Sequence, residues 1–255
     1  MKPDLVAFGG EGEAGFRVLA PGRNLKVVNQ MGTSFASPYL LRQAVELRIM
    51  GGDDLSLLSI KTLLIHHADR GENDSAEVGW GRPPAASDIL NGYADTLRYL
   101  FQGRLEPGKF LRADLPKPFA GYSEPVKIKA TFCYKPPVDS YDPSSYTKAA
   151  LDICFVPDIN AEPDQKGHLP VKVFFDMDGG VLDENQDAEA ILWANIKCNE
   201  NEMEPSILSA PSFDVRHVDR GSGSVPDSIE YSLIVDVRPT PADLKTLESE
   251  LASVN

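Results

Sequence analysis

The segment from Gly32 to Pro38 constrains the fold of this chain more than any other stretch. It reads Gly-Thr-Ser-Phe-Ala-Ser-Pro and leads into a mostly apolar run from Phe35 to Met50. Glycine lets the backbone pass close to a ligand, and a proline in the first helical turn sacrifices no hydrogen bond. The pattern predicts a sharp turn that places Ser34 at a helix N-terminus. Free backbone N–H groups and the helix dipole there favour a developing oxyanion.

The helix predicted over residues 35–50 is apolar on most of its sides. A helix of this kind is usually buried in the middle of a domain, and Gly51 and Gly52 are typical of its end. It therefore needs a sheet or other helices to cover it. Left uncovered, it would expose on the order of several hundred Å² of apolar surface, a size associated with interfaces or aggregation.

Residues Gly32–Pro38 resemble the serine motif G-T-S-x-A-x-P of the subtilisin-like serine peptidases, the subtilases. Lys2–Ala7 resembles the K-P-D-x-x-A stretch that precedes this motif in the family. Lys61–Ala68 and Gly79–Pro83 are similar to segments that follow the serine helix in a bacterial subgroup. That subgroup carries a β-rich C-terminal extension, which Thr131–Pro137 resembles, and is often encoded beside an AAA-type ATPase. The resemblance covers residues 2 to about 100 and is weaker in the extension.

The resemblance implies that Ser34 is a catalytic nucleophile and that its backbone N–H helps to hold the oxyanion. A serine hydroxyl needs a base and an orienting carboxylate, which subtilases supply in the order aspartate, histidine, serine. No histidine precedes Ser34, and no D-T-G or H-G-T segment occurs in the chain. Asn24 and Asn29 match no oxyanion asparagine segment. We therefore expect the C-terminal part of a subtilase catalytic domain, inactive by itself.

Four histidines follow the serine, and none is an obvious replacement base. His66 and His67 would require a rewired triad, and His67 falls on the apolar stripe of a second helix predicted over residues 55–68. We expect both to be packing residues, while a role as a substitute base stays open. His168 lies in a polar loop and His217 on a strand-like alternation, and the sequence identifies no carboxylate partner for either.

We expect no metal and no cofactor. Residues 176–187 resemble a calcium loop at two or three positions. Gly180 stands where a ligand is expected, and Val181 stands where the loop needs glycine. This segment is therefore interpreted as a hairpin turn with solvated acids.

The three cysteines are far apart and form no Cys-x-x-Cys pair: Cys133, Cys154 and Cys198. Their number and spacing favour reduced, partly buried thiols in a cytoplasmic protein. No apolar run approaches the roughly 20 residues of a membrane span, and residues 1–10 lack a secretory pattern. We expect no membrane partner.

The net charge of −13 is uneven along the chain. Residues 1–103 contain 10 Lys and Arg against 12 Asp and Glu, whereas residues 104–255 contain 15 against 26. An acidic surface repels phosphate backbones, so we expect no nucleic-acid partner.

The hydrophobic period changes near Gly103. A third helix is predicted over residues 87–101, and residues 126–132 then alternate as a half-buried strand does. Further strands are predicted over residues 110–115, 150–156, 171–177, 191–197, 212–218 and 231–238, and a last helix from 240 to about 251. The predicted fold is α/β over residues 1–103, an incomplete subtilisin-like catalytic domain. An all-β antiparallel sandwich with a terminal helix follows over residues 104–255.

Two functions follow as hypotheses. The first is a truncated serine endopeptidase whose substrate is a protein or peptide and whose acyl-enzyme forms on Ser34. The second is a non-catalytic interaction module, in which the acidic sandwich binds a partner protein such as an AAA-type ATPase. A third reading joins them: a separate N-terminal peptidase segment complements this chain. We expect the whole chain to self-associate or be poorly soluble, and residues 104–255 alone to be soluble.

Overall fold

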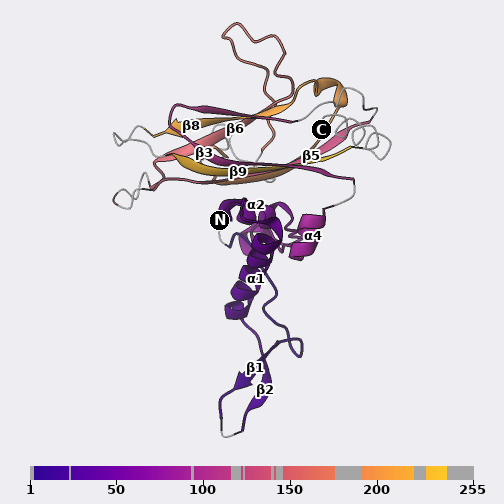
Figure 1. Cartoon of the computed structure of the whole chain (residues 1–255), viewed down its shortest axis with the longest axis vertical. Coiled ribbons are helices and arrows are strands. Elements are labelled where there is room, and N and C mark those ends of the chain that lie inside the picture. Colours follow the sequence, from indigo (N-terminus) through magenta and orange to yellow (C-terminus); the bar gives the residue numbers. More distant parts are fainter. Residues whose placement is uncertain are drawn as a thin grey trace. The chain divides into compact units, whose positions relative to one another are not determined.

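The computed structural model describes residues 3–22, 24–92, 95–115, 122, 124–138, 141, 146–175, 191–220 and 228–239. The chain divides into two compact units, Met1–Gly92 and Tyr93–Asn255 (Figure 1). We call them the N-terminal unit and the two-sheet unit. The segment interpreted as a hairpin turn at 176–187 and the predicted last helix both lie outside the described residues.

The N-terminal unit combines one hairpin with helices. Strands β1 (Phe16–Ala20) and β2 (Lys26–Gln30) pair antiparallel and precede α1 (Thr33–Gly51). Helices α2 (Leu57–His66), α3 (Ser75–Val78) and α4 (Ala86–Asn91) follow, and both α2 and α4 contact α1 (Figure 1). Stacking of Phe16 on Phe35, with ring centroids 5.2 Å apart, holds the hairpin against the start of α1.

Helix α1 is less buried than its apolar sequence predicts. Only Gln43 and Leu47 are buried, on the side that faces the α4 region, where the Gln43 side chain donates to the Pro84 carbonyl at 3.2 Å. The sequence predicts a helix that needs a covering sheet, and the described N-terminal unit leaves most sides of α1 uncovered. The reason is that the N-terminal unit offers only short helices to cover α1.

Helix α2 is short and well covered. The Ser56 side chain caps it by accepting a hydrogen bond from the Ser59 N–H at 3.0 Å, as polar N-cap residues do. Its buried apolar residues form the small core of the N-terminal unit: Ile60, Leu63, Leu64 and Ile65.

The two-sheet unit is β-rich and antiparallel throughout its described ladders. One sheet has the order β3-β9-β5-β7 and the other β4-β8-β6, and the two lie as layers in Figure 1. Residues of both sheets share one hydrophobic core, in which Phe132, Phe155 and Phe213 are fully buried. The strands are β3 (Leu97–Leu105), β4 (Phe110–Asp114), β5 (Val126–Lys135), β6 (Ala149–Val156), β7 (Ile196–Met203), β8 (Ser212–Asp219) and β9 (Ile229–Arg238), with a 3₁₀ turn at Pro205–Ile207.

Three predicted elements differ from the structure. The helix predicted over residues 87–101 ends at Asn91, because Gly92 follows with φ 60° and residues 97–105 pair with β9 instead. Within the strand predicted over 171–177, the described residues 171–175 form only an isolated bridge between Lys172 and Phe155. The strand predicted over 191–197 begins with a helical turn and enters β7 at its end. The two compact units divide after Gly92.

Candidate active site

The turn into α1 presents Ser34 to solvent. Gly32 precedes the helix with φ 153°, a conformation that favours glycine, and its carbonyl accepts the Phe35 N–H at 3.0 Å. Ser34 is the second residue of α1, and its side chain is exposed. The first N–H groups of an α-helix have no helical carbonyl four residues before them, and of these the Phe35 N–H is bound by the Gly32 carbonyl instead. The Ser34 N–H is therefore free to hold an anionic oxygen.

The sequence predicts Pro38 in the first turn of α1, and this prediction is wrong. The helix begins at Thr33, so Pro38 occupies the second turn. A proline at this position removes the hydrogen bond to the carbonyl four residues earlier, which is that of Ser34. The Ser34 carbonyl therefore lacks the usual helical donor four residues later.

The N-terminal segment, residues 3–10, supplies such a contact. The Gly32 N–H donates to the Gly9 carbonyl at 2.7 Å, and the Val6 N–H donates to the Gly81 carbonyl at 3.0 Å. A Cβ on Gly9 would lie 3.2 Å from the Gly32 oxygen, so the backbones approach closely. The segment thus links the start of α1 to a distant turn.

That turn, residues 79–83, requires glycine for steric reasons. The Trp80 N–H donates to the Asp4 carbonyl at 2.9 Å. A Cβ on Gly79 would lie 2.1 Å from the Pro3 oxygen, and Gly79 has φ 61°. A side chain at this position would separate the turn from the N-terminal segment.

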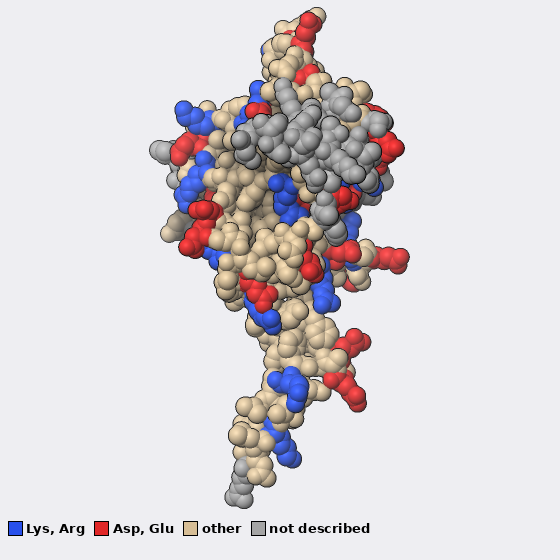
Figure 2. All heavy atoms as spheres, turned by 45° about the vertical axis from the view of Figure 1, so that its right-hand side comes forward, with Lys and Arg blue, Asp and Glu red and all other residues tan. Residues whose placement is uncertain are grey.

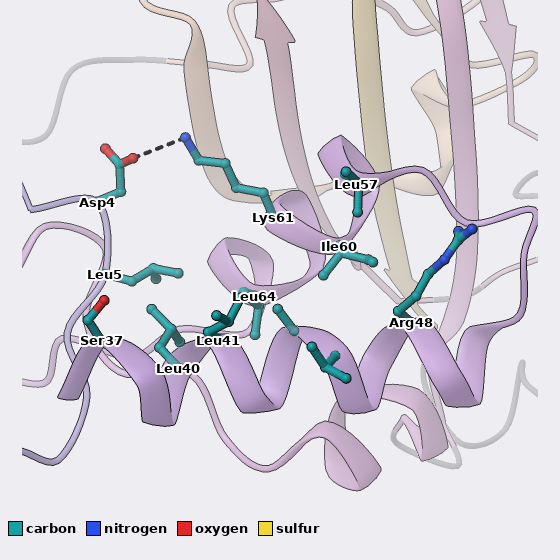
Figure 3. A pocket seen from close by; sticks show the side chains of 12 residues that line it. Asp4, Leu5, Ser37, Leu40, Leu41, Arg48, Leu57, Ile60, Lys61 and Leu64 are labelled. Carbon is teal, nitrogen blue, oxygen red and sulfur yellow. Dashed lines mark ion pairs between the residues drawn. The ribbon is translucent and has the colours of Figure 1, made fainter. Parts of the chain in front are cut away.

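Helix α2 joins the same assembly through an ion pair. Lys61 Nζ lies 3.0 Å from Asp4 Oδ2, as Figure 3 shows. Four stretches far apart in sequence therefore meet in the N-terminal unit. They are the stretches on which the family resemblance rests: the described part of 2–7, then 32–38, 61–68 and 79–83.

An apolar groove of about 560 Å³ runs between α1 and α2. In Figure 3, Ser37 lies near one end and Arg48 near the other. Ser34 does not line the groove. Its lining is mostly aliphatic: Asp4, Leu5, Ser37, Leu40, Leu41, Ala44, Val45, Arg48, Leu57, Ile60, Lys61 and Leu64.

The described residues do not assemble a catalytic triad. Among them, no histidine or carboxylate hydrogen-bonds to the Ser34 hydroxyl. His66 is 1% exposed, and its ring packs edge-on against His67 at 4.9 Å. His67 Nδ1 lies 2.9 Å from the Leu63 carbonyl of its own helix. These contacts favour the packing role for both histidines.

The remaining polar candidates lie in other structural settings. The Asn29 side chain donates to the Glu13 carbonyl at 2.9 Å and so fixes the hairpin, while Asn24 is exposed. His168 lies in an exposed loop, 3.8 Å from Asp164 Oδ2. The backbone N–H of His168 is the main cause of the lowered pKa of Asp164. His217 is part of β8 in the two-sheet unit.

The cysteines are free thiols, as their spacing predicts. Burial is the main cause that raises the pKa of Cys154 to about 11, so this thiol stays protonated at neutral pH. The Thr131 hydroxyl donates to Cys198 Sγ at 3.0 Å across strands β5 and β7.

The described helices include none long and apolar enough to cross a membrane.

One buried cation was missed by the sequence analysis. Lys197 in β7 is 5% exposed, and its Nζ lies over the rings of Phe132 and Tyr134 at 5.8 and 5.6 Å. The ammonium group donates to the Leu151 carbonyl at 3.3 Å. Burial lowers the pKa of Lys197 to about 8. The sequence of β7 is rich in polar residues and resembles an exposed strand. The burial of Lys197 becomes visible only in the strand register, which places it opposite Phe132.

No model of a known protein family matches the chain, and no curated protein matches its sequence.

Proposed function

We propose that this chain is the C-terminal part of a subtilisin-like serine endopeptidase, with Ser34 as its nucleophile. One observation carries the proposal: residues 3–10 are hydrogen-bonded to the start of α1 through the Gly9 carbonyl and to the 79–83 turn through Val6 and Asp4, and the Asp4 carboxylate pairs with Lys61 of α2. In this proposal the N-terminal unit belongs to an α/β catalytic domain, and the two-sheet unit is a β-sandwich extension. The free thiols support a cytoplasmic location.

The proposed reaction is hydrolysis of a protein or peptide through an acyl-enzyme. Ser34 Oγ attacks the peptide carbonyl carbon while a histidine takes the hydroxyl proton, and the Ser34 N–H holds the oxyanion. The histidine then gives the proton to the leaving amine, and water hydrolyses the ester. The base and its orienting aspartate come from an N-terminal peptidase segment outside this chain.

The surface of α1 supports a complementing segment. At 100° per residue, Ser34 lies on the same side of the helix as Leu41, Val45 and Ile49, which are exposed by 64%, 49% and 75%. A segment that covers these side chains would bring its own groups beside Ser34. This geometry accounts for both the uncovered helix and the missing base.

A co-expression experiment tests the proposal. We expect no hydrolysis of an unfolded protein substrate by the chain alone, and hydrolysis when a segment bearing aspartate and histidine, encoded upstream in the same locus, is co-expressed. Ser34→Ala abolishes this activity, whereas Ser37→Ala, one turn further along α1, retains it. Activity that survives Ser34→Ala would overturn the assignment.

A second candidate function is a non-catalytic interaction module. The two-sheet unit contains a complete core of its own, so it does not require a catalytic domain to fold. Its acidic excess suits a partner with a basic surface, such as an AAA-type ATPase. Binding of the ATPase by residues 93–255 alone, with no activity in the co-expression experiment, would favour this module.

A further inference from the structure

Residues 171–175, which we call the strap, cross between the edge strands of the two sheets. Strand β6 ends one sheet and β7 ends the other, and each pairs with a single neighbour in the described ladders. The Lys172 N–H donates to the Phe155 carbonyl of β6 at 2.9 Å, and this bridge is the strap's one backbone pairing with a described strand. After it the strap leaves β6 and turns to β7.

The strap is held on β7 by side chains that face the core. The Phe174 carbonyl accepts hydrogen bonds from the side-chain amides of Asn199 and Asn201, each at 2.9 Å. In the register with β5 these asparagines lie opposite Ala130 and Ile128, which are fully buried. Residues directly opposite each other share one face of a sheet, so the asparagines point inward. Two amide donors thus bind one backbone carbonyl, a contact that any extended peptide can make.

The two aromatic side chains of the strap pack among the aromatic residues of the core. Phe174 and Phe175 are 3% and 7% exposed. The Phe174 ring centroid lies 5.5 Å from that of Phe155 and 5.0 Å from that of Phe213, and the Phe175 centroid lies 6.1 Å from that of Phe213. The neighbouring Val173 is by contrast 78% exposed. The aromatic pair therefore anchors the strap.

The strap leaves part of the β6 edge without a strand partner. The Leu151 carbonyl accepts from the Lys197 side chain at 3.3 Å, and the Phe155 carbonyl accepts from Lys172, so both point away from β8. Alternate residues of a strand direct their N–H and C=O groups to the same side, so those of Ile153 point to this edge too. Among the described residues, neither a bridge nor a loop hydrogen bond involves Ile153. An occupant that continued along β6 would form these additional hydrogen bonds.

We propose that the edges of β6 and β7 form a peptide-binding site, which the strap occupies as an autoinhibitory segment. The ligand is an extended segment of a partner protein with two adjacent aromatic residues. It replaces the strap, binds the two asparagines through its backbone and pairs with β6 over a longer stretch by strand addition. The strap of a second copy would gain nothing over the chain's own strap, whereas a longer segment gains the hydrogen bonds to Ile153.

Charge does not single out this edge. Acidic and basic side chains are intermixed over the part of the two-sheet unit that Figure 2 shows. The backbone and the aromatic pair of the ligand therefore specify it. The site depends neither on a peptidase function nor on an ATPase partner.

Fluorescence anisotropy with labelled peptides tests the site on the full chain. In the test variant, residues 171–175 are replaced by Gly-Ser-Gly-Ser-Gly, which removes the anchors and preserves the chain length. The short probe copies residues 169–175, and the long probe adds Thr-Val-Lys-Val to its C-terminus. We expect the variant to bind the long probe at least about tenfold more tightly than the natural chain does, and more tightly than the short probe. A long probe with both phenylalanines changed to serine should not bind.

Substitutions in β7 test the backbone recognition. In the strap-replaced chain, N199L/N201L should weaken binding of the long probe by about tenfold, because both amide donors are lost. Glu202→Leu, at an exposed position on the opposite face of β7, should leave binding unchanged.

Lys172→Pro keeps the test decisive where the strap-replaced chain does not fold. It removes the bridge donor and retains both aromatic anchors, so this variant should bind the long probe more tightly than the natural chain does. Circular dichroism verifies that each variant is folded. No gain in affinity in either folded variant, binding of the serine probe, equal affinity for the short and long probes, or no effect of N199L/N201L would each overturn the proposal. Dimers of the natural chain that strap replacement abolishes would assign the site to a second copy instead.

Discussion

The two units of this chain differ in how fully they bury their apolar side chains. In the two-sheet unit, Phe132, Phe155 and Phe213 are fully buried between strands from both sheets. In the N-terminal unit, α1 buries two residues and exposes Leu41, Val45 and Ile49. Both regions are similarly rich in apolar residues, so composition alone does not predict how far a unit buries them. The difference lies in the elements that pack together: two sheets in one unit, and one hairpin with mostly short helices in the other.

The units also use their ion pairs differently. In the two-sheet unit, Arg112 binds Asp214 with two hydrogen bonds of 2.9 and 2.8 Å between neighbouring strands, and the Asp214 side chain is 8% exposed. On α1, the Arg42–Glu46 pair lies on the surface, with side chains 72% and 38% exposed. The Arg112–Asp214 pair therefore reinforces the two-sheet unit, whereas the exposed Arg42–Glu46 pair contributes little to the stability of the N-terminal unit.

The largest expected effect is on the core of the two-sheet unit. Phe213 packs against Phe155 and Phe174 with ring centroids 5.0 Å away from each. Phe213→Ala should lower the free energy of unfolding by about 3–5 kcal/mol, because a cavity replaces the ring. Leu41→Ala, at an exposed position of α1, should change the free energy of unfolding by less than about 0.5 kcal/mol. Urea unfolding of both variants measures the contrast, and equal losses would break the comparison.

Lys197 makes the stability of the two-sheet unit depend on pH. The folded chain releases this proton near pH 8, whereas the unfolded chain keeps it until about pH 10.4. Between these values the unfolded state binds more protons, so the free energy of unfolding rises with pH by about 3 kcal/mol. Urea titrations from pH 7 to pH 10.5 measure this rise.

Lys197→Met is the matched variant for that measurement. Methionine preserves much of the side-chain volume and removes the titrating amine, so the difference between the two proteins isolates Lys197 from other groups. We expect the contribution that rises between these pH values to disappear in the variant. A parallel pH dependence in both proteins would show that the ammonium is not held as the structure has it.

A smaller effect is expected at the ion pairs. Arg112→Ala leaves the Asp214 carboxylate nearly buried without its guanidinium, and the free energy of unfolding should fall by about 2 kcal/mol. Arg42→Ala removes an exposed partner and should cost less than about 0.5 kcal/mol. Thermal and urea unfolding of the two variants tests this order. A loss for Arg42→Ala equal to that for Arg112→Ala would contradict it.

An effect smaller than that of Arg112→Ala is expected at the cap of α2. Ser56→Ala removes the acceptor of the Ser59 N–H and should lower the stability of the N-terminal unit by about 1 kcal/mol. Hydrogen exchange of the first turn of α2 detects this loss locally. Unchanged exchange in that turn would mean that packing, and not the cap, fixes the start of the helix.

Local patterns predicted the elements whose periods are strong. The helix expected over 35–50 spans Thr33–Gly51, and the alternation over 126–132 lies within β5. The residues after Gly92 were misassigned because Leu97–Leu105 becomes a strand through pairing with β9, more than a hundred residues away. Such pairing carries no local signature, and neither do cross-strand pairs such as Arg112 with Asp214.

In the candidate site, too, some features follow from local sequence and others depend on contacts between distant segments. The exposed position of Ser34 at the start of α1 follows from its motif, because glycine and the helix N-terminus are local features. The contacts of Gly32 with Gly9, and of Trp80 with Asp4, join segments that only the folded chain brings together. The burial of Lys197 likewise depends on strand register. Sequence patterns therefore located Ser34 at the start of α1 but not the contacts around it.

Labelling by a fluorophosphonate probe tests the central claim most directly. The purified chain is treated alone and after co-expression with the proposed N-terminal segment that bears aspartate and histidine, and the modified residue is mapped by mass spectrometry. The account predicts a label on Ser34 only in the complemented sample and none in Ser34→Ala. A Ser34 label on the isolated, folded chain would mean that its own residues supply the base. An unlabelled complemented sample would contradict the assignment of Ser34 as a nucleophile.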